Sequence, residues 1–211
     1  ISYPVIYEVQ VEAIVRAAVK VRRESGDTAK VHIMLPLVSD KNEMAILKGV
    51  IDRTAKRVLD ELGEKLEYKV GTMVETPRAA LTAGEIAKLA DFFSFGTNDL
   101  TQATFAFSRD DVEAKFMAKY LEEKILPESP FEVLDATGVG RLVRMAVEEG
   151  RRTKPSLEVG ICGEHGGEPR SITFFNEAGL NYVSCSGFRI PVARLAAAQA
   201  MLSKEKSTTT V

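Results

Sequence analysis

The chain has 211 residues, of which 45% are hydrophobic and 27% are charged. A chain of this size and composition buries roughly 70% of the surface it would expose when unfolded, which excludes a disordered tail or a fibre. Lys and Arg total 28 and Asp and Glu total 30, so the formal net charge of −2 gives no basic field for nucleic acid. The sequence has no run of 18 or more uncharged apolar residues, so we expect no membrane partner.

The few cysteines and histidines limit the metal and redox chemistry. Cys162 and Cys185 cannot build a disulfide framework or a four-ligand zinc site, and His32 and His165 add too few ligands for the usual clusters. A reducing compartment is the simplest interpretation, and we expect a cytoplasmic location, with a plastid or another organelle left open. The sequence starts at Ile1 and enters helical periodicity at once, so we expect it to begin inside a larger protein.

The hydrophobic pattern predicts alternating helices and strands. Apolar residues at three- and four-residue spacing from Val9 to Val21 predict a first helix, which ends before Gly26. The apolar run at 31–38 predicts a strand buried on both faces, with His32 as a core residue. The same alternation continues to the end of the chain. Further helices are predicted over 42–62, 79–89, 111–125, 137–150, 169–178 and 190–203, and further strands over 68–74, 92–96, 157–162 and 182–185.

Five βα units without an internal linker predict an α/β fold with parallel strands. An open doubly wound sheet and the later part of an eight-stranded barrel both fit this order. Polar residues follow four different strands, which favours the barrel, because an open sheet concentrates its ligand residues at one switch point. These residues are Glu75, Thr76, Asn98, Asp99, Cys162, Glu164, Cys185 and Ser186. We therefore predict an incomplete (β/α)8 TIM-type barrel over 1–203 and a disordered tail over 204–211.

Glu75 and Asp99 follow successive predicted strands, which end at the same edge of a parallel sheet. Two carboxylates facing a common volume suit a hard divalent cation. Mg²⁺ fits best, because it keeps water and substrate oxygens in its other positions. The alternative is that Glu75 caps a helix and Asp99 caps a turn. Taken separately, the two residues leave both interpretations open.

Residues 96–99 (GTND) and Cys162 are the other candidates for chemistry. The backbone N–H groups of 96–99 would face an anionic ligand over the barrel mouth, although the same letters are ordinary turn chemistry. Cys162 ends a strand and is followed by Gly-Glu-His-Gly-Gly, an exit that supports an acid–base role. The alternative is that Cys162 is a small buried hydrophobic residue, which is the usual role of a free cysteine. Cys185 is the weaker candidate, because packing explains it.

Four segments resemble one known family. They are VGTMVETPRAAL at 70–81, FFSFGTNDLTQ at 92–102, GICGEHGG at 160–167 and YVSCSGFRIP at 182–191. Together they resemble the C-terminal phosphoenolpyruvate (PEP)-binding barrel of the pyruvate phosphate dikinase family, over nearly the whole chain. GTNDLTQ and GxCGE are shared with PEP synthase and with enzyme I of the sugar phosphotransferase system, whereas GEHGG is more typical of the dikinase.

The resemblance implies a role for each candidate residue. Glu75 and Asp99 match the magnesium ligands, and Cys162 matches the proton donor at the methylene carbon. The residues that match substrate contacts are Glu75, Gly96, Thr97, Asn98, Asp99 and Arg109. The resemblance further implies phosphoryl transfer to pyruvate through a magnesium-bound enolate, from a phosphohistidine on a separate domain of the same enzyme.

The family also implies the properties of the whole enzyme. By this resemblance, the whole enzyme is expected to convert ATP, phosphate and pyruvate to AMP, diphosphate and PEP. Mg²⁺ is the expected cofactor and a homodimer is the expected assembly. In the family, three strands that carry two more substrate-binding arginines precede the part that this chain matches. The alternatives are a PEP synthase or an enzyme I homologue, or a catalytically inactive dimerisation fragment.

Overall fold

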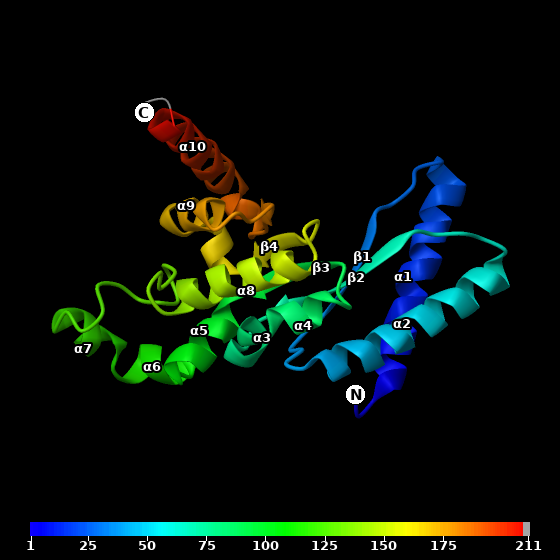
Figure 1. The fold of residues 1–211 in the computed structure, drawn as a ribbon, viewed down its shortest axis with the longest axis horizontal. Coiled ribbons are helices and arrows are strands. Elements are labelled where there is room, and N and C mark those ends of the chain that lie inside the picture. The colour runs from blue at the N-terminus through cyan, green and yellow to red at the C-terminus, as the bar shows by residue number, and fades with distance from the viewer. Residues whose placement is uncertain (209–211) are drawn as a thin grey trace.

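The computed structural model describes residues 1–208. Five strands form a parallel sheet in the order β1-β2-β3-β4-β5, with helices between successive strands (Figure 1). The strands are β1 (Val31–Leu35), β2 (Tyr68–Val74), β3 (Phe92–Gly96), β4 (Glu158–Cys162) and β5 (Tyr182–Val183). The α-helices are α1 (Pro4–Ser25), α2 (Lys41–Leu62), α3 (Pro77–Leu81), α4 (Ala83–Ala87), α5 (Thr97–Phe105), α6 (Arg109–Lys115), α7 (Met117–Glu122), α8 (Val139–Thr153), α9 (Pro169–Glu177) and α10 (Ile190–Thr208), and the 3₁₀ helices are η1 (Glu164–Gly167) and η2 (Gly187–Arg189). The predicted α/β class with parallel strands is confirmed.

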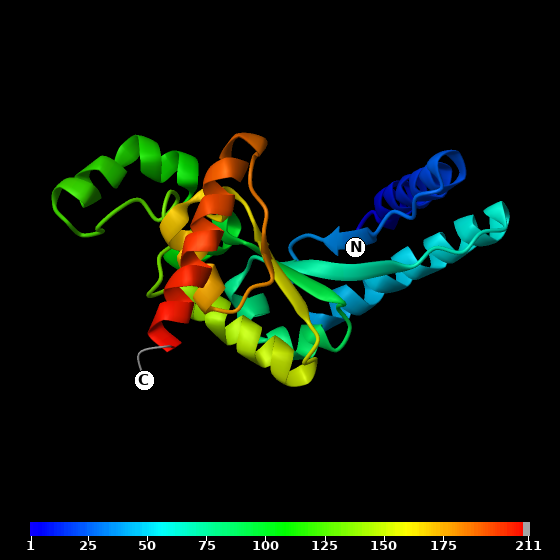
Figure 2. The ribbon, with the colours of Figure 1, turned by 90° about the horizontal axis from the view of Figure 1, so that it is seen from above.

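Local sequence explains where the long helices start and stop. Helix α2 begins with a capping box, in which the Asp40 side chain accepts from the backbone N–H of Asn42 at 2.8 Å and Glu43 accepts from the backbone N–H of Asp40 at 3.1 Å. It ends at Gly63, whose φ of 65° is a left-handed conformation that glycine adopts without cost. Helices α1 and α2 pack together at the end of the molecule away from α6 and α7 (Figure 2).

Several predicted boundaries are corrected. The strand predicted over 31–38 ends at Leu35, because Pro36 has no N–H to donate and Leu37 turns into the left-handed region at φ 52°. The last strand ends at Val183 rather than at 185. The helix predicted over 79–89 is the pair α3 and α4, and that predicted over 111–125 is the pair α6 and α7. The tail predicted over 204–211 lies outside the described residues from 209 onward, and α10 continues to Thr208.

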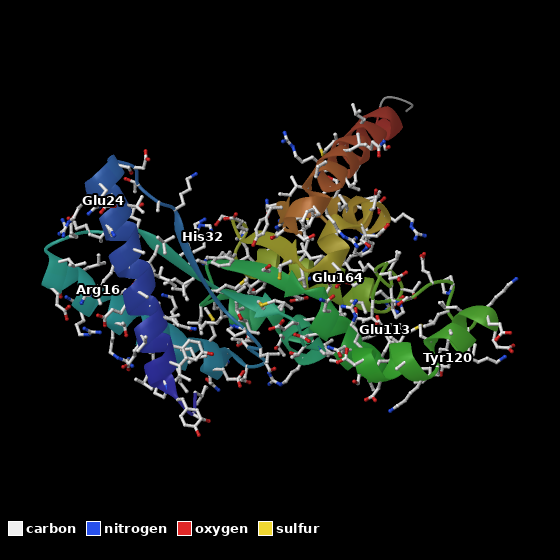
Figure 3. All side chains as sticks on the ribbon, turned by 180° about the vertical axis from the view of Figure 1, so that it is seen from behind. Arg16, Glu24, His32, Glu113, Tyr120 and Glu164 are labelled. Atoms are coloured by element: carbon white, nitrogen blue, oxygen red, sulfur yellow. The ribbon has the colours of Figure 1, made fainter. Side chains whose placement is uncertain are left out.

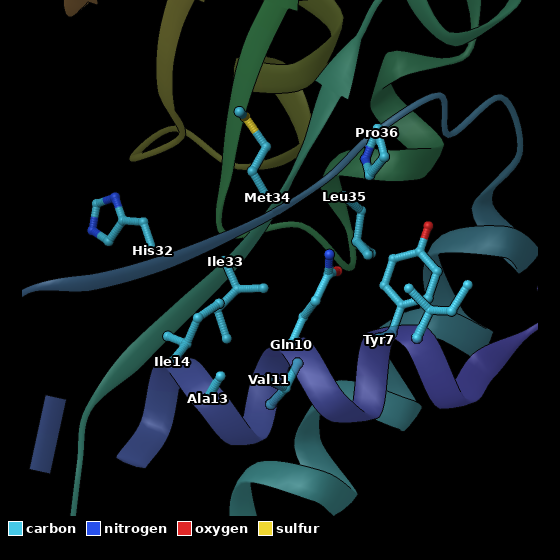
Figure 4. Close-up of a pocket in the computed structure, with 11 residues that line it drawn as sticks. Tyr7, Gln10, Val11, Ala13, Ile14, His32, Ile33, Met34, Leu35 and Pro36 are labelled. Carbon is cyan, nitrogen blue, oxygen red and sulfur yellow. The ribbon is translucent and has the colours of Figure 1, made fainter. Parts of the chain in front are cut away.

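The central and edge strands differ in burial. Every residue of β3 is buried, whereas β1 alternates buried and exposed residues. His32 is therefore exposed, and its ring stacks on Phe92 with centroids 5.1 Å apart, so its prediction as a core residue is wrong. A groove of about 720 Å³ lies between α1 and β1, lined mainly by apolar side chains (Figure 4). Within residues 1–208, no helix combines the length and the apolar character that crossing a membrane requires.

Candidate active site

Candidate residues lie side by side at the carboxyl ends of β2, β3 and β4. Val74 pairs with Phe95, so Glu75 comes level with Gly96, and Gly96 pairs with Cys162 on the other side. Because adjacent strands lie about 4.8 Å apart, this register brings an acid, a glycine and a thiol to one edge of the sheet. The structure thus brings together residues that are 87 positions apart in the sequence.

Glu75 is held in place by the turn that follows the edge strand β1. Its side chain is only 3% exposed, and its Oε1 atom accepts a hydrogen bond from the backbone N–H of Leu37 at 2.7 Å. A Cβ atom at position 96 would collide with the Glu75 carboxylate, so Gly96 is required for this approach. The conformation of Leu37 costs a non-glycine residue roughly 1–2 kcal/mol, which the Glu75 hydrogen bond helps to offset. Gly96 therefore makes space for the acid.

Asp99 supplies a second carboxylate beside the first. It lies in the first turn of α5, where Gln102 Nε2 donates to its Oδ1 atom at 3.1 Å. Burial raises the pKa of Glu75, and the negative charge of nearby Asp99 raises this pKa further. Among the groups of the described chain that shift this pKa, none is a cation. A cation placed beside Glu75 and Asp99 would therefore lower the pKa of Glu75 and favour its ionised form.

Two carboxylates are a small ligand set. In the part of the chain that the structure describes, no group of three or more His, Cys, Asp or Glu is placed to hold a metal ion. One or two protein carboxylates, with water and substrate oxygens completing the shell, are typical of Mg²⁺. The donor set of Glu75 and Asp99 therefore fits magnesium and does not fit zinc, whose sites use three or four protein ligands that include His or Cys.

Cys162 lies on the other side of Gly96. Its thiol is half-buried and donates to the carbonyl oxygen of Phe95, with 3.7 Å between sulfur and oxygen. Burial raises the pKa of Cys162, and the charges of Glu75 and Asp99 raise it further. The thiol is therefore kept protonated at neutral pH, the state that a proton donor needs. Cys185 packs instead against buried apolar residues of α9 and α10, which agrees with the packing role expected from the sequence.

Residues 97 and 98 open helix α5, which sequence reasoning missed by treating GTND as a turn. The helix begins directly after β3, with Gly96 at its N-cap and no side-chain cap. Asn98 lies beside Gly163, and its Oδ1 atom is buried without a hydrogen-bond partner among the described residues. An unsatisfied buried oxygen of this kind is suited to a ligand. Thr97, in contrast, is completely buried and its hydroxyl contacts His165.

Arg109 is held by acids that the sequence did not link to it. Its two Nη atoms bond both carboxylate oxygens of Glu164 at 3.1 and 2.9 Å, and its Nε bonds Glu113 at 3.1 Å. Its backbone N–H donates to the side chain of Gln102 at 2.9 Å. Figure 3 shows Glu113 and Glu164 on the same side of the molecule, away from His32. Gln102 thereby connects Arg109 to Asp99, because its side chain bonds both residues. In the sequence, the only sign of the contact between Gln102 and Asp99 is their spacing of three residues, which places them on one face of a helix.

A parallel βα sheet with an acid pair and a thiol at its carboxyl edge has the arrangement of the (β/α) barrel class, whose active sites lie at the carboxyl ends of the strands. Residues 1–202 match the family described as PEP-utilising enzyme, PEP-binding domain, and the chain belongs to this family. The solved structure of a citrate lyase from Burkholderia xenovorans aligns with a TM-score of 0.60 and 17% identity, over 90% of this chain and 53% of that chain. This likeness concerns the fold alone, and it supports the prediction of a partial (β/α) barrel.

Curated relatives point to one member of the family. The pyruvate, phosphate dikinase of Clostridium symbiosum is 54% identical over 205 residues, which are 97% of this chain and 23% of the relative. The chloroplastic pyruvate, phosphate dikinase 1 of Arabidopsis thaliana is 58% identical over 203 residues, which are 96% of this chain and 21% of the relative. The predicted resemblance is confirmed, and the chain spans about a fifth of the length of these relatives.

Proposed function

We propose that this chain is the PEP- and pyruvate-binding catalytic domain of a pyruvate, phosphate dikinase. The full enzyme would convert ATP, phosphate and pyruvate to AMP, diphosphate and PEP, and this domain would pass the phosphoryl group from a phosphohistidine to pyruvate. The observation that carries the proposal is the row formed by Glu75, Gly96 and Cys162 across three neighbouring strands. The identity of 54–58% to dikinases over almost the whole chain supports it.

Glu75 and Asp99 are the residues that would hold Mg²⁺. When bound there, the ion supplies Lewis-acid stabilisation to the carbonyl and carboxylate oxygens of the substrate. Glu75 is buried next to Asp99, whose negative charge raises the pKa of Glu75, and a bound cation would compensate that charge. Asn98, with its unpartnered amide oxygen, and the backbone of Gly96 would orient the substrate beside this pair.

Cys162 is the residue that would move the proton. In the direction of pyruvate formation, the phosphoryl group of PEP first passes to the histidine of the separate domain, which breaks the bond between phosphorus and the enol oxygen and leaves the enolate of pyruvate. The Cys162 Sγ–H then gives a proton to the methylene carbon of this enolate, which becomes the methyl group, and the sulfur is left as a thiolate. In the reverse direction, the thiolate takes one methyl proton back. The raised pKa of Cys162 favours the protonated thiol and so suits the donor role.

Arg109 would bind the phosphate of PEP after giving up a partner. Its guanidinium fork is matched to Glu164 in the ligand-free chain, and a phosphate offers the same bidentate geometry with more charge. Substrate binding would therefore replace Glu164 at Arg109. When the ligand is absent, the pairing with Glu164 keeps the Arg109 side chain ordered.

The test uses the full-length protein. Calorimetric titration with oxalate, a planar mimic of the pyruvate enolate, is made with and without Mg²⁺, beside a Glu75→Gln variant. Binding that requires both Mg²⁺ and Glu75 is the expected result, and binding that is unchanged by removing either contradicts the metal assignment. A turnover assay then measures whether inorganic phosphate is required and diphosphate is released. Turnover without phosphate would contradict the dikinase and favour a PEP synthase.

A further inference from the structure

The Gly-Glu-His-Gly-Gly run folds as η1, with His165 near its centre. The His165 side chain is completely buried. Its Nδ1 atom lies 2.7 Å from Thr97 Oγ1, and its Nε2 atom lies 3.0 Å from the carbonyl oxygen of Pro130. The imidazole thus joins three segments: the turn after β4, the first residue of α5, and the connection between α7 and α8.

The partners of His165 fix its tautomer. A carbonyl oxygen only accepts hydrogen bonds, so Nε2 donates to Pro130. Burial lowers the pKa of His165, while the facing acids Glu164 and Glu168 oppose this shift and Arg109 adds to it. In the neutral ring Nδ1 accepts, and the Thr97 hydroxyl donates to it. Both hydrogen bonds therefore have a defined direction.

The backbone around His165 leaves it little room to move. A Cβ atom at Gly166 would collide with the carbonyl oxygen of Ser184, and one at Gly167 would collide with the side chain of Arg189. The turn is therefore packed directly against the chain that follows β5. This contact explains the paired glycines, and it makes His165 a fixed point from which Thr97 is held.

We propose, on the basis of the proposed function, that His165 is a positioning residue that sets the acid side of the site against the Cys162 thiol. Asn98 and Asp99 follow Thr97 in the first turn of α5, and Cys162 lies three residues before His165. The bond between His165 and Thr97 therefore ties the start of α5 to the end of β4. Without it, α5 and a ligand held there shift away from the thiol, and a misplacement of about 1 Å costs roughly a hundredfold in rate.

Two amide substitutions separate the two arms of the imidazole. In His165→Asn the amide oxygen takes the place of Nδ1 and accepts from Thr97, whereas in His165→Gln the amide reaches the place of Nε2 and donates only to Pro130. The measurements, on the full-length protein, are solvent proton exchange at the pyruvate methyl group and Mg²⁺-dependent affinity for oxalate. We expect His165→Gln to slow exchange by about tenfold to a hundredfold with oxalate affinity changed by less than about twofold. We expect His165→Asn to keep most of the exchange rate.

Thr97→Val provides an independent check, because it removes the hydroxyl while nearly keeping the shape of the side chain. It should slow exchange as much as His165→Gln, and the double variant should lose no more, since both changes remove one bond. Equal losses in the Asn and Gln variants, or a loss of oxalate affinity that matches the loss of exchange, would overturn the inference and leave His165 a folding residue. Absence of exchange in the unmodified protein would contradict the proposed function, and with it this inference.

Discussion

The central strands and the edge strands of the sheet carry different kinds of residue. β2, β3 and β4 are covered by helices, and each leads to a candidate residue: Glu75 follows β2, Asp99 lies in the helix after β3, and Cys162 ends β4. β1, in contrast, exposes His32 and Met34 on one face. The central strands have a neighbour on each side, so their ends are fixed in register, while β1 is paired on one side only within residues 1–208. Groups that must be placed accurately are thus found where hydrogen bonds on both sides determine their position.

The two cysteines give the sharpest comparison. Cys162→Ala should reduce proton exchange at the pyruvate methyl group by about a hundredfold to ten-thousandfold, because it removes the proposed proton donor. Cys185→Ala, after the edge strand β5, should leave the exchange rate within about threefold of the unmodified protein, because it only trims packing. The measurement is deuterium incorporation into the pyruvate methyl group. Equal losses of exchange in both variants would contradict the ranking of Cys162 above Cys185.

Core packing gives the second comparison. Phe93, on β3, is completely buried, and Phe93→Ala should lower the free energy of unfolding by about 3–5 kcal/mol. Met34, on β1, is 39% exposed, and Met34→Ala should change the same quantity by about 1 kcal/mol or less. Urea unfolding of the two variants measures both. A large loss at Met34 would show that this face of β1 is covered in solution.

The third comparison concerns how stability depends on pH for two glutamates at opposite ends of β2. Burial raises the pKa of Glu75 above the ordinary value of 4.5, so the folded state binds this proton more tightly than the unfolded state. Its contribution to stability is therefore complete below pH 4.5 and is lost as the pH rises through the folded pKa. Without metal at pH 7, Glu75→Gln should raise Tm by about 2 °C or more, with a smaller gain at acidic pH.

Glu67→Gln, at the exposed position just before β2, serves as the control for that experiment and should leave Tm nearly unchanged at both pH values. Differential scanning calorimetry without added Mg²⁺ provides the readout. A lower Tm for Glu75→Gln at pH 7 would indicate that the ionised carboxylate supports the fold, which is opposite to the sign worked out above.

The smallest effect concerns the acids around Arg109. Glu164→Gln should tighten PEP binding by about two- to fivefold, because the variant competes less well with phosphate for the guanidinium. Glu113→Gln, which loses a single contact at 3.1 Å, should have a smaller effect. Calorimetric titration of the full-length protein with PEP compares them. Weaker binding in Glu164→Gln would show that Glu164 presents Arg109 to the ligand and does not compete with it.

The sequence predicted the central strands better than the edges. The bounds of β2 and β3 match the predicted 68–74 and 92–96, since a continuous apolar run with turn residues at its ends has few alternative interpretations. The run at 31–38 was interpreted in the same way, but β1 lies at an edge, and the burial of alternate residues depends on neighbours that local sequence does not specify. His32 was misjudged for this reason.

The candidate site shows a similar division. The positions of Glu75, Asp99 and Cys162 at strand ends followed from the βα rhythm, and their proximity follows from the register. Helix α5 was missed because Gly-Thr-Asn-Asp is equally common in turns, and no side-chain cap marks its start. The contacts of Arg109 with Glu164, and of His165 with Thr97, cross between loops and have no periodic signal. The functional roles of these residues stay predictions until the experiments above are made.

The hydrogen bond from the Leu37 amide to Glu75 also links the turn after β1 to the acid pair. This amide senses the electron density of the carboxylate, which changes when the group is protonated or takes up a cation. Its nitrogen and proton resonances in a ¹⁵N-labelled sample would therefore report occupancy of the acid pair directly, without substrate and without turnover. Leu37 serves in this way as an intrinsic spectroscopic probe, located in the turn after β1 and apart from every residue proposed to take part in the chemistry.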